Sequence, residues 1–280
     1  MKVKIVWKKG GSNGEDAVSD ADRPPQALVD IHSHFLWGLD DGAKDLDESV
    51  AMLRMAADHG TTDIVATPHA NFQYKYDSLV IAERITQLRA IPDLPVRLHT
   101  GCDFHLGFGN IREALVNPRK FTINGLNYLL VEFADNLIPP TIEEVLRRFL
   151  ANEVIPIVTH PERNPVLQQS VPRMKEWVSM GCLVQITAQS LSGEFGKFAK
   201  RSAWELIHEN LVHVVASDGH DMVYRTTRLD GAWKLLNQEL NETTAARLLI
   251  HNPTAVVRGA PLPTIRGGPE PVEQVSDLRA

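Results

Sequence analysis

Apolar runs of strand length alternate with helical patterns from residue 27 to residue 260, and no linker interrupts the series. Such alternation predicts an α/β fold with parallel strands, because each helix returns the chain to the same edge of a sheet. We expect strands at 27–32, 63–67, 96–103, 128–133, 155–160, 183–187 and 212–217. Seven strands with helices between them predict a closed or distorted β/α barrel, whose chemistry sits at the carboxyl ends of the strands.

The intervals between the strands carry helix signals. Asp45 can cap a first helix, Glu48 can complete a capping box three residues later, and Gly60 can end it. Further helical patterns cover 78–89, 142–152, 173–180, 197–209, 228–236 and 242–251. Residues 1–26 and 261–280 are polar and lack periodicity, so we expect flexible extensions on either side of one domain at 27–260.

Composition excludes some partners. The net charge of −6 and the lack of a basic stripe argue against nucleic acid. Residues 3–7 are too short an apolar run for a secretory signal, and no run of about 18 apolar residues exists, so we expect no membrane span and a cytoplasmic location. Cys102 and Cys182 form no CxxC pair, which fits a reducing compartment.

Six polar clusters rich in His, Asp and Glu follow apolar, strand-like runs. They lie at 30–34, 40–42, 67–69, 132, 160–163 and 217–220. Carboxylates and imidazoles are costly beside apolar segments unless they are paired or bind a metal. Their repetition at strand ends therefore predicts one multinuclear metal centre.

Two of the clusters share a spacing. His32 and His34 are two residues apart on an extended segment, so both side chains point the same way, and Asp218 and His220 repeat this geometry. Either pair alone is also compatible with hydrogen-bonded surface residues. Together they favour metal ligands.

The remaining donors have more ordinary alternatives. His69 follows Thr67-Pro68 and could be a turn residue, and Asp41 could serve a turn or a helix cap. Glu132 ends an apolar run, where a structural role would require a buried ion pair, so a metal is the better explanation.

Two arginines are candidates for binding an anion. Arg163 lies three residues after His160, and Arg225 lies five residues after His220. The planar guanidinium fork matches two phosphate oxygens, although each arginine alone would more often be a salt-bridge partner at the surface.

Other hydrolytic nucleophiles are excluded by inspection. Neither cysteine has an arginine six residues later, and the chain has no GxxxxGK[ST] and no GxSxG motif. A metal-activated water remains, and it favours aryl phosphates because a phenol, with a pKa of about 10, leaves without a strong acid. Four aromatic side chains in loops after the ligands could either stack on a phenyl ring or pack the loops: Trp37, Phe72, Tyr74 and Tyr76.

Taken together, the motifs DIHSHFLWGLDDGAK, VATPHAN, LLVEF, VTHPERN and VVASDGH resemble the PHP (polymerase and histidinol phosphatase) superfamily. Within it they are most similar to the bacterial manganese-dependent tyrosine-protein phosphatases of the CpsB/YwqE type. The resemblance runs from about residue 29 to residue 236, with the motifs in the family's order.

The resemblance implies a distorted, TIM-like (β/α)7 barrel with three divalent ions, Mn²⁺ first and Fe or Zn as alternatives. The first ion would be held by His32, His34, Asp103 and Asp218, the second by Asp103, Glu132 and His160, and the third by Asp41, His69 and His220. Arg163 and Arg225 match the family's phosphate-contacting arginines. The family usually has Glu where this chain has Asp103, a carboxylate one methylene shorter. The implied substrate is the phosphotyrosine-containing tail of a bacterial tyrosine kinase of capsule or exopolysaccharide synthesis.

Three classes of function compete at this stage. The first is the protein-tyrosine phosphatase. The second is another hydrolase, either a small-molecule phosphatase like histidinol phosphatase or an amidohydrolase, which usually has a metal-bridging Lys where this chain has Glu132. The third is a non-catalytic, metal-binding regulator, an idea encouraged only by Asp103. The sequence leaves open the oligomeric state, the metal and the role of the first 26 residues.

Overall fold

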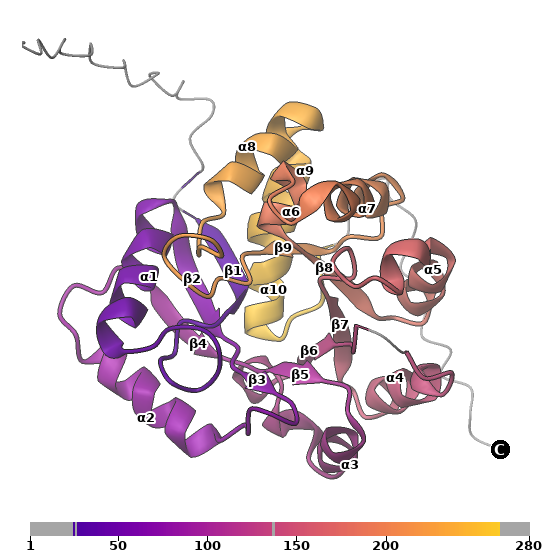
Figure 1. Cartoon of the computed structure of the whole chain (residues 1–280), viewed down its shortest axis with the longest axis horizontal. Coiled ribbons are helices and arrows are strands. Elements are labelled where there is room, and N and C mark those ends of the chain that lie inside the picture. The colour runs from indigo at the N-terminus through magenta and orange to yellow at the C-terminus, as the bar shows by residue number, and fades with distance from the viewer. Residues whose placement is uncertain (1–24, 26, 136–137, 264–280) are drawn as a thin grey trace, which may run out of the picture.

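The computed structural model describes residues 25, 27–135 and 138–263, and shows parallel strands enclosed by helices (Figure 1). The strands are β1 Leu28–Ser33, β2 Thr61–Ala66, β3 His69–Ala70, β4 Arg97–Thr100, β5 Asp103–His105, β6 Tyr128–Glu132, β7 Ile155–Thr159, β8 Leu183–Thr187 and β9 Val214–Ala216. They form one ladder in the order β1-β2-β4 and a second in the order β3-β5-β6-β7-β8-β9. Every strand pair is parallel.

The two ladders join on both sides into a ring of neighbours. On one side, the chain that forms β2 continues into β3, and the chain that forms β4 continues into β5. On the other side, Ser33 bridges Gly219 just beyond β9, and the N–H of His34 donates to the carbonyl of Gly219 at 2.8 Å. The predicted distorted barrel is therefore confirmed.

Strands are found in all seven predicted regions, but the one expected at 96–103 is split into β4 and β5. Pro68, which lies between the neighbouring strands β2 and β3, lacks an N–H, so it cannot continue the ladder there. Its carbonyl instead accepts a hydrogen bond from the N–H of Asp103 at 3.2 Å. The interruption coincides with the first residue of β5, which is a predicted metal ligand.

Helices occupy the intervals between the strands. They are α1 Leu46–Asp58, α2 Ser78–Arg89, α3 Phe108–Val116, α4 Ile142–Ala151, α5 Val171–Ser179, α6 Ala188–Ser192, α7 Gly196–His208, α8 Asp230–Glu239, α9 Glu242–Ala246 and α10 Asn252–Arg258. Short 3₁₀ turns are η2 Pro118–Lys120, η3 Ile123–Gly125 and η4 Leu167–Gln169, and a π turn, η5 Arg247–His251, joins α9 to α10. Helices α3, α6 and α10 were not predicted from the sequence.

The capping of α1 is partly as predicted. The Asp45 side chain accepts a hydrogen bond from the N–H of Glu48 at 2.9 Å. In a capping box, Glu48 would accept a hydrogen bond from the N–H of Asp45. It instead accepts one from the N–H of Lys44, one residue earlier, at 2.9 Å. Gly60, with φ of +96°, follows the end of the helix as expected.

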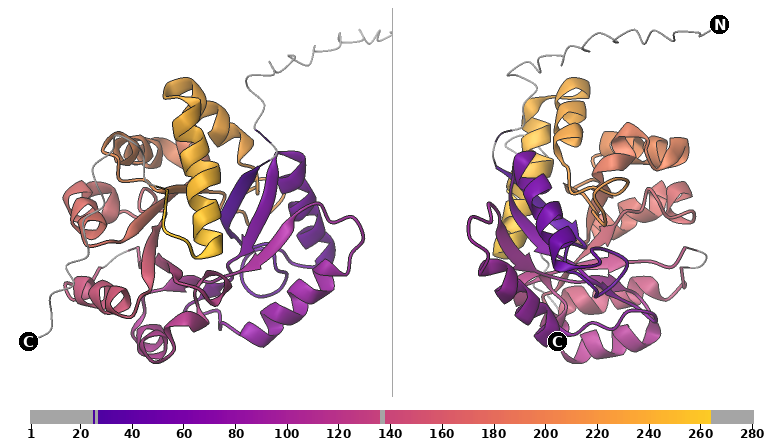
Figure 2. Two further views of the ribbon diagram at one scale, coloured as in Figure 1. Left: turned by 180° about the vertical axis from the view of Figure 1, so that it is seen from behind. Right: turned by 60° about the vertical axis from the view of Figure 1, so that its left-hand side comes forward.

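A buried apolar cluster fills the amino end of the barrel. It contains Val29 and Val214 from the starts of β1 and β9, together with Val256 and Val257 of α10. Seen from behind, Figure 2 shows α10 lying across this end. The carboxyl ends of the strands are therefore the end left for chemistry.

Among the described residues, no helix has the length and apolar character needed to cross a membrane. The predicted extensions, 1–26 and 261–280, lie outside the described residues except for Pro25 and residues 261–263.

Candidate metal centre

The nine donors predicted from the sequence converge at the carboxyl end of the barrel. Their ligand atoms form overlapping groups in which all atoms lie within 4.8 Å of one another. The groups are His34, Asp41, His69 and His220; His32, His34 and Asp103; His32, His160 and Asp218; and His69, Asp103 and Glu132. The first contains the whole set that the resemblance assigns to the third ion.

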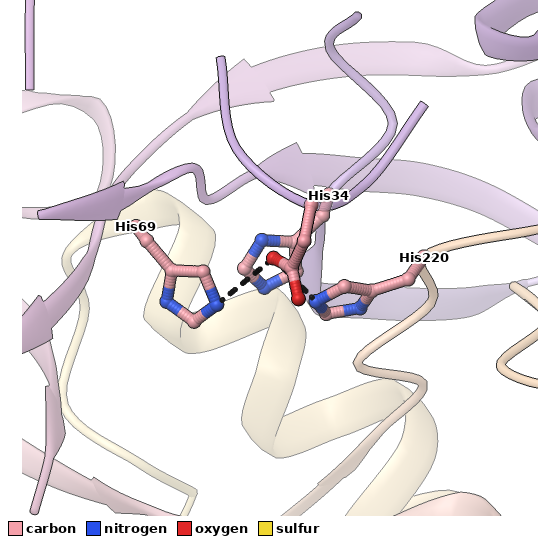
Figure 3. Close-up of side chains that lie close together, drawn as sticks. His34, His69 and His220 are labelled. Carbon is pink, nitrogen blue, oxygen red and sulfur yellow. Dashed lines mark ion pairs between the residues drawn. The ribbon is translucent and has the colours of Figure 1, made fainter. Parts of the chain in front are cut away.

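The group around Asp41 lies at the outer edge of the centre. Figure 3 shows the rings of His34, His69 and His220 gathered around a carboxylate. This carboxylate is Asp41, whose Oδ1 lies 3.4 Å from Nε2 of His69 and 3.5 Å from Nε2 of His220. Two imidazoles thus share one carboxylate oxygen, as expected for donors that could share an ion.

Asp103 occupies the middle of the centre although its side chain is one methylene shorter than Glu. It is fully buried, and its Oδ2 lies 3.1 Å from Nδ1 of His69 and 3.6 Å from Nε2 of His32. Glu132 approaches the same His69 atom at 3.6 Å, and its other oxygen lies 3.8 Å from Nε2 of His160. Asp103 therefore reaches a position between donors of different groups.

Asp218 connects the histidines to the two arginines. Its Oδ1 lies 3.3 Å from Nε2 of His32 and 3.4 Å from Nε2 of His34. Its Oδ2 accepts hydrogen bonds from Arg163 and from Nη2 of Arg225, the latter at 2.6 Å. The predicted anion-binding arginines thus lie at the centre, side by side on one carboxylate oxygen.

Two donors adopt a left-handed backbone conformation within two residues of the carboxyl end of a strand. His160 follows β7 with φ of +34°, and Asp218 follows β9 with φ of +52°. Non-glycine residues rarely adopt this conformation, and such residues cluster at functional sites. Backbone hydrogen bonds from His160 to Gln185 and from Asp218 to His32, both of 2.8 Å, hold the two turns.

The turn that carries Asp41 depends on Gly42. A Cβ atom at this position would lie 2.0 Å from the carbonyl oxygen of His34. Only glycine lets the turn approach this closely, so Gly42 brings Asp41 against the HxH segment.

Residues behind the donors orient the imidazoles. Asp40 Oδ2 lies 2.7 Å from Nδ1 of His34, and Gln185 Oε1 lies 2.9 Å from Nδ1 of His32. Each contact leaves Nε2 of the histidine facing the other donors. These two roles were not predicted from the sequence. The signal available for Gln185 was that it is a polar residue in the middle of an apolar strand. The signal for Asp40 was its place beside Asp41.

A second buried contact joins the two HxH-like segments. Asp30, fully buried, accepts hydrogen bonds from the N–H and hydroxyl of Ser217, at 3.1 and 2.5 Å, and from the N–H of His32 at 3.2 Å. This carboxylate holds the segment after β9 against β1. It thereby sets the separation between His32 and Asp218.

The electrostatics of the centre suit neutral imidazole ligands at two positions. Burial lowers the pKa of His160 to about 3, and the charge of Arg163 adds to the effect. Burial also lowers the pKa of His220 to about 4, together with His34. A metal needs the neutral form, so these two rings require no deprotonation before binding.

Elsewhere the carboxylates outweigh burial. Burial favours neutral His32, but Asp218 and Asp103 raise its pKa to about 9. Burial likewise opposes the charge on His69, while the neighbouring carboxylates of Asp103 and Asp41 raise its pKa to about 12. The protons on His32 and His69 balance the negative charge of the neighbouring carboxylates, which divalent cations would otherwise neutralise.

The donor set fits metal ions. Several buried polar atoms have no hydrogen-bond partner among the described residues: Nδ1 of His69, both oxygens of Asp103, Oδ1 of Asp218 and Nε2 of His220. Buried polar groups without partners are rare, and these all border the same space. Imidazoles and carboxylates without thiolates suit Mn, Fe or Zn.

Comparisons with known proteins agree with this geometry. The sequence profile described as capsular polysaccharide synthesis, CpsB/CapC, matches residues 28–258. This chain belongs to the CpsB/CapC family. The predicted resemblance to the CpsB/YwqE type is thereby confirmed.

Two curated relatives in this family align over most of the chain. Tyrosine-protein phosphatase YwqE of Bacillus subtilis (strain 168) is 33% identical over 249 residues, 85% of this chain and 97% of that protein. Tyrosine-protein phosphatase CpsB of Streptococcus pneumoniae is 30% identical over 241 residues, 82% of this chain and 98% of that protein.

One similar solved structure comes from the same family, and another shares only the fold. A chain from the crystal structures of Bacillus subtilis YwqE and Streptococcus pneumoniae CpsB, described as unique metal-dependent tyrosine phosphatases, matches with a TM-score of 0.79 and 31% identity, covering 88% of this chain and 100% of that one. The phosphotriesterase homology protein of Escherichia coli shares only the fold, at 8% identity, a TM-score of 0.52, and coverage of 84% and 99%.

The four loop aromatics differ in their surroundings. Tyr74 stacks on His69, with ring centroids 6.0 Å apart, and the Phe72 side chain is fully exposed. Trp37 lies under the guanidinium of Arg84, and Tyr76 packs on Phe121. Only Tyr74 therefore contacts a donor, while Trp37 and Tyr76 pack the loops.

Proposed function

We propose that this chain is a metal-dependent protein-tyrosine phosphatase that hydrolyses phosphotyrosine on a bacterial tyrosine kinase of capsule or exopolysaccharide synthesis. The observation that carries the proposal is the junction at Asp218, where one oxygen faces imidazole donors and the other binds both arginines. A phosphate bound at this junction would meet metal ions on one side and guanidinium groups on the other. The family membership and the names of the relatives support the same activity.

Three divalent ions, Mn²⁺ first, are proposed for the nine donors, partitioned as the resemblance implies. Three such ions against the four carboxylates leave two positive charges, which match a phosphate dianion. When bound, the ions supply positive charge and lower the pKa of a water molecule so that it attacks phosphorus at neutral pH.

The arginines bind and orient the phosphoryl group. Burial opposes the charge of Arg163, but Asp218 and Glu162 raise its pKa, so it stays cationic throughout the physiological range. A guanidinium has five N–H donors, so the bond to Asp218 leaves others for phosphate oxygens. The positive charge of the two arginines neutralises the negative charge on the equatorial oxygens of the phosphoryl group as the leaving group departs.

The leaving group determines the specificity for tyrosine. A phenol has a pKa of about 10, so it departs as phenolate with little help from an acid, whereas an alkyl alcohol requires a proton. We therefore expect phosphotyrosine and other aryl phosphates to be hydrolysed faster than phosphoserine or histidinol phosphate.

The test is a substrate panel assayed on one metal-loaded preparation. Phosphotyrosine peptide should exceed phosphoserine peptide and histidinol phosphate by at least about tenfold in kcat/KM, and a chelator should abolish turnover. His160→Ala should lose bound metal, whereas Arg163→Ala should retain metal and lose rate. Arg54→Ala, a control at an exposed position on α1, should behave as wild type.

The outcomes separate the competing functions. Equal turnover of phosphoserine and phosphotyrosine peptides would overturn the tyrosine specificity. A preference for histidinol phosphate would favour the small-molecule phosphatase, and metal binding without turnover of any phosphate ester would favour the regulator.

A further inference from the structure

One buried side chain, Gln189, bonds both to the residue before Arg225 and to the loop against which Arg163 packs. Gln189 lies on α6, directly after β8, and is 8% exposed. Its Nε2 donates to Oε2 of Glu194 at 2.5 Å and to the backbone carbonyl of Tyr224 at 2.6 Å. Both N–H groups of the amide are thus used, each on a different loop.

One of these contacts leads to Arg225. Tyr224 precedes it in a turn that Asp221 stabilises by accepting the N–H groups of Tyr224 and Arg225 at 2.6 and 3.2 Å. The turn closes on the centre, because the carbonyl of Arg225 accepts the N–H of His220 at 2.6 Å. Gln189 therefore bonds to the residue directly before Arg225 in this turn.

The other contact leads to Arg163. Glu194 is followed by Phe195, and the guanidinium of Arg163 lies over the Phe195 ring, 4.2 Å from its centroid. A cation placed over an aromatic face is held by the ring quadrupole. The loop that Gln189 fixes through Glu194 therefore provides the platform on which Arg163 rests.

We propose that Gln189 is a positioning residue for the phosphate site. It fixes the two segments that support Arg163 and Arg225, so that both guanidinium groups meet over the phosphoryl group. This inference rests on the proposed phosphatase function. An arginine side chain loses rotamer entropy when it is fixed. Arginines that are held before the substrate arrives lose less on binding, so the phosphate is bound more tightly.

The role is separable from folding. Leu191 anchors α6 in the core with no exposed surface, and the carbonyl of Gln189, which accepts from the N–H groups of Gly193 and Glu194, does not depend on its side chain. Gln189→Leu removes both donors at nearly constant volume. Gln87→Leu is the matched control, because Gln87 is an exposed helical glutamine whose side chain bonds to Glu83 in the same helix.

The experiment measures p-nitrophenyl phosphate hydrolysis and inhibition by inorganic phosphate with the Mn²⁺-loaded full chain. Gln189→Leu should raise the KM and the inhibition constant of phosphate together, by about tenfold, with unchanged metal content. Gln87→Leu should change neither. In an Arg225→Ala background, Gln189→Leu should lower kcat/KM by a smaller factor than it does in the wild type, because only Arg163 is then left for Gln189 to position.

Two results would overturn the inference: unchanged KM and phosphate inhibition in Gln189→Leu, or an equal effect of the substitution with and without Arg225. If Gln189→Leu does not fold, Gln189→Asn, whose amide is one methylene short of its partners, must show the same pattern for the inference to stand. Failure of the proposed function itself looks different, since then the wild type would lack turnover or Arg225→Ala would keep wild-type kinetics.

Discussion

Gln185 Oε1 lies 2.9 Å from Nδ1 of His32, and both side chains are fully buried. Gln185 accepts the Nδ1 proton, so Nε2, which lies 3.6 and 3.3 Å from Asp103 and Asp218, is left as the atom that would bind a metal. A partner of this kind behind a metal ligand typically contributes 10- to 100-fold to metal affinity.

Gln185→Met should therefore weaken Mn²⁺ binding by roughly tenfold or more, because the apolar side chain fills the space without accepting a hydrogen bond. Gln185→Glu, which keeps an acceptor, is the matched control and should retain most of the affinity. Mn²⁺ titration by calorimetry measures both. Equal affinity of the Met variant and the wild type would show that Gln185 does not orient His32.

Asp103 belongs to two of the donor groups, and neither of its oxygens has a hydrogen-bond partner among the described residues. Asp103→Asn should lose at least one ion per chain and at least about 100-fold in kcat/KM, since a neutral amide is a poor bridging ligand and an N–H would face imidazole donors. Elemental analysis and phosphotyrosine peptide assays check this. Full metal occupancy in the variant would contradict a ligand role for Asp103.

Gly42 should tolerate no side chain. In Gly42→Ala the new Cβ would lie 2.0 Å from the His34 carbonyl oxygen, so the turn must move and take Asp41 with it. We expect loss of metal from the group around Asp41 and a lower free energy of unfolding. Gly109→Ala on α3 is the control: its Cβ would meet nothing within 4 Å, and alanine is favoured over glycine in a helix. If both variants bind metal like the wild type, the close approach at Gly42 is not required.

The barrel and its donor positions could be predicted from the sequence because both follow from short-range patterns. Strand-length apolar runs set the order of the strands, and parallel strands bring their carboxyl ends together, so His32 and Asp218 meet although 186 positions separate them. The i, i+2 spacing then indicated the direction of the side chains.

The missed features depend on contacts that no local pattern encodes. Helix α10 follows a π turn and contains Pro253 in its first turn, whereas the helical pattern predicted from the sequence ended at residue 251. Packing of Val256 and Val257 under the barrel stabilises the continuation. Gln189 follows a predicted strand and resembles an ordinary polar residue, and its partners Glu194 and Tyr224 are determined only by how two loops fold.

Part of the acid sensitivity should arise outside the metal centre, at His213. This ring accepts a hydrogen bond at Nδ1 from the N–H of Val184, at 3.1 Å. Burial lowers its pKa to about 4, and the charge of Arg247 adds to this. The unfolded chain, with a pKa near 6.5, therefore takes up the proton first on acidification, so the stability from neutral His213 is complete above about pH 6.5 and is lost as the pH falls toward 4.

The free energy of unfolding should accordingly fall by roughly 1–2 kcal/mol between pH 7.5 and 5.5 on account of His213 alone. Urea unfolding of the chelator-treated protein at both pH values measures the fall, and His213→Gln, which keeps an acceptor but cannot be protonated, should show a fall smaller by that amount. His251→Gln, at an exposed histidine of the π turn, is the control and should retain the full dependence. An identical loss in the wild type and in His213→Gln would place the acid sensitivity elsewhere, because the imidazole that titrates would then be another one.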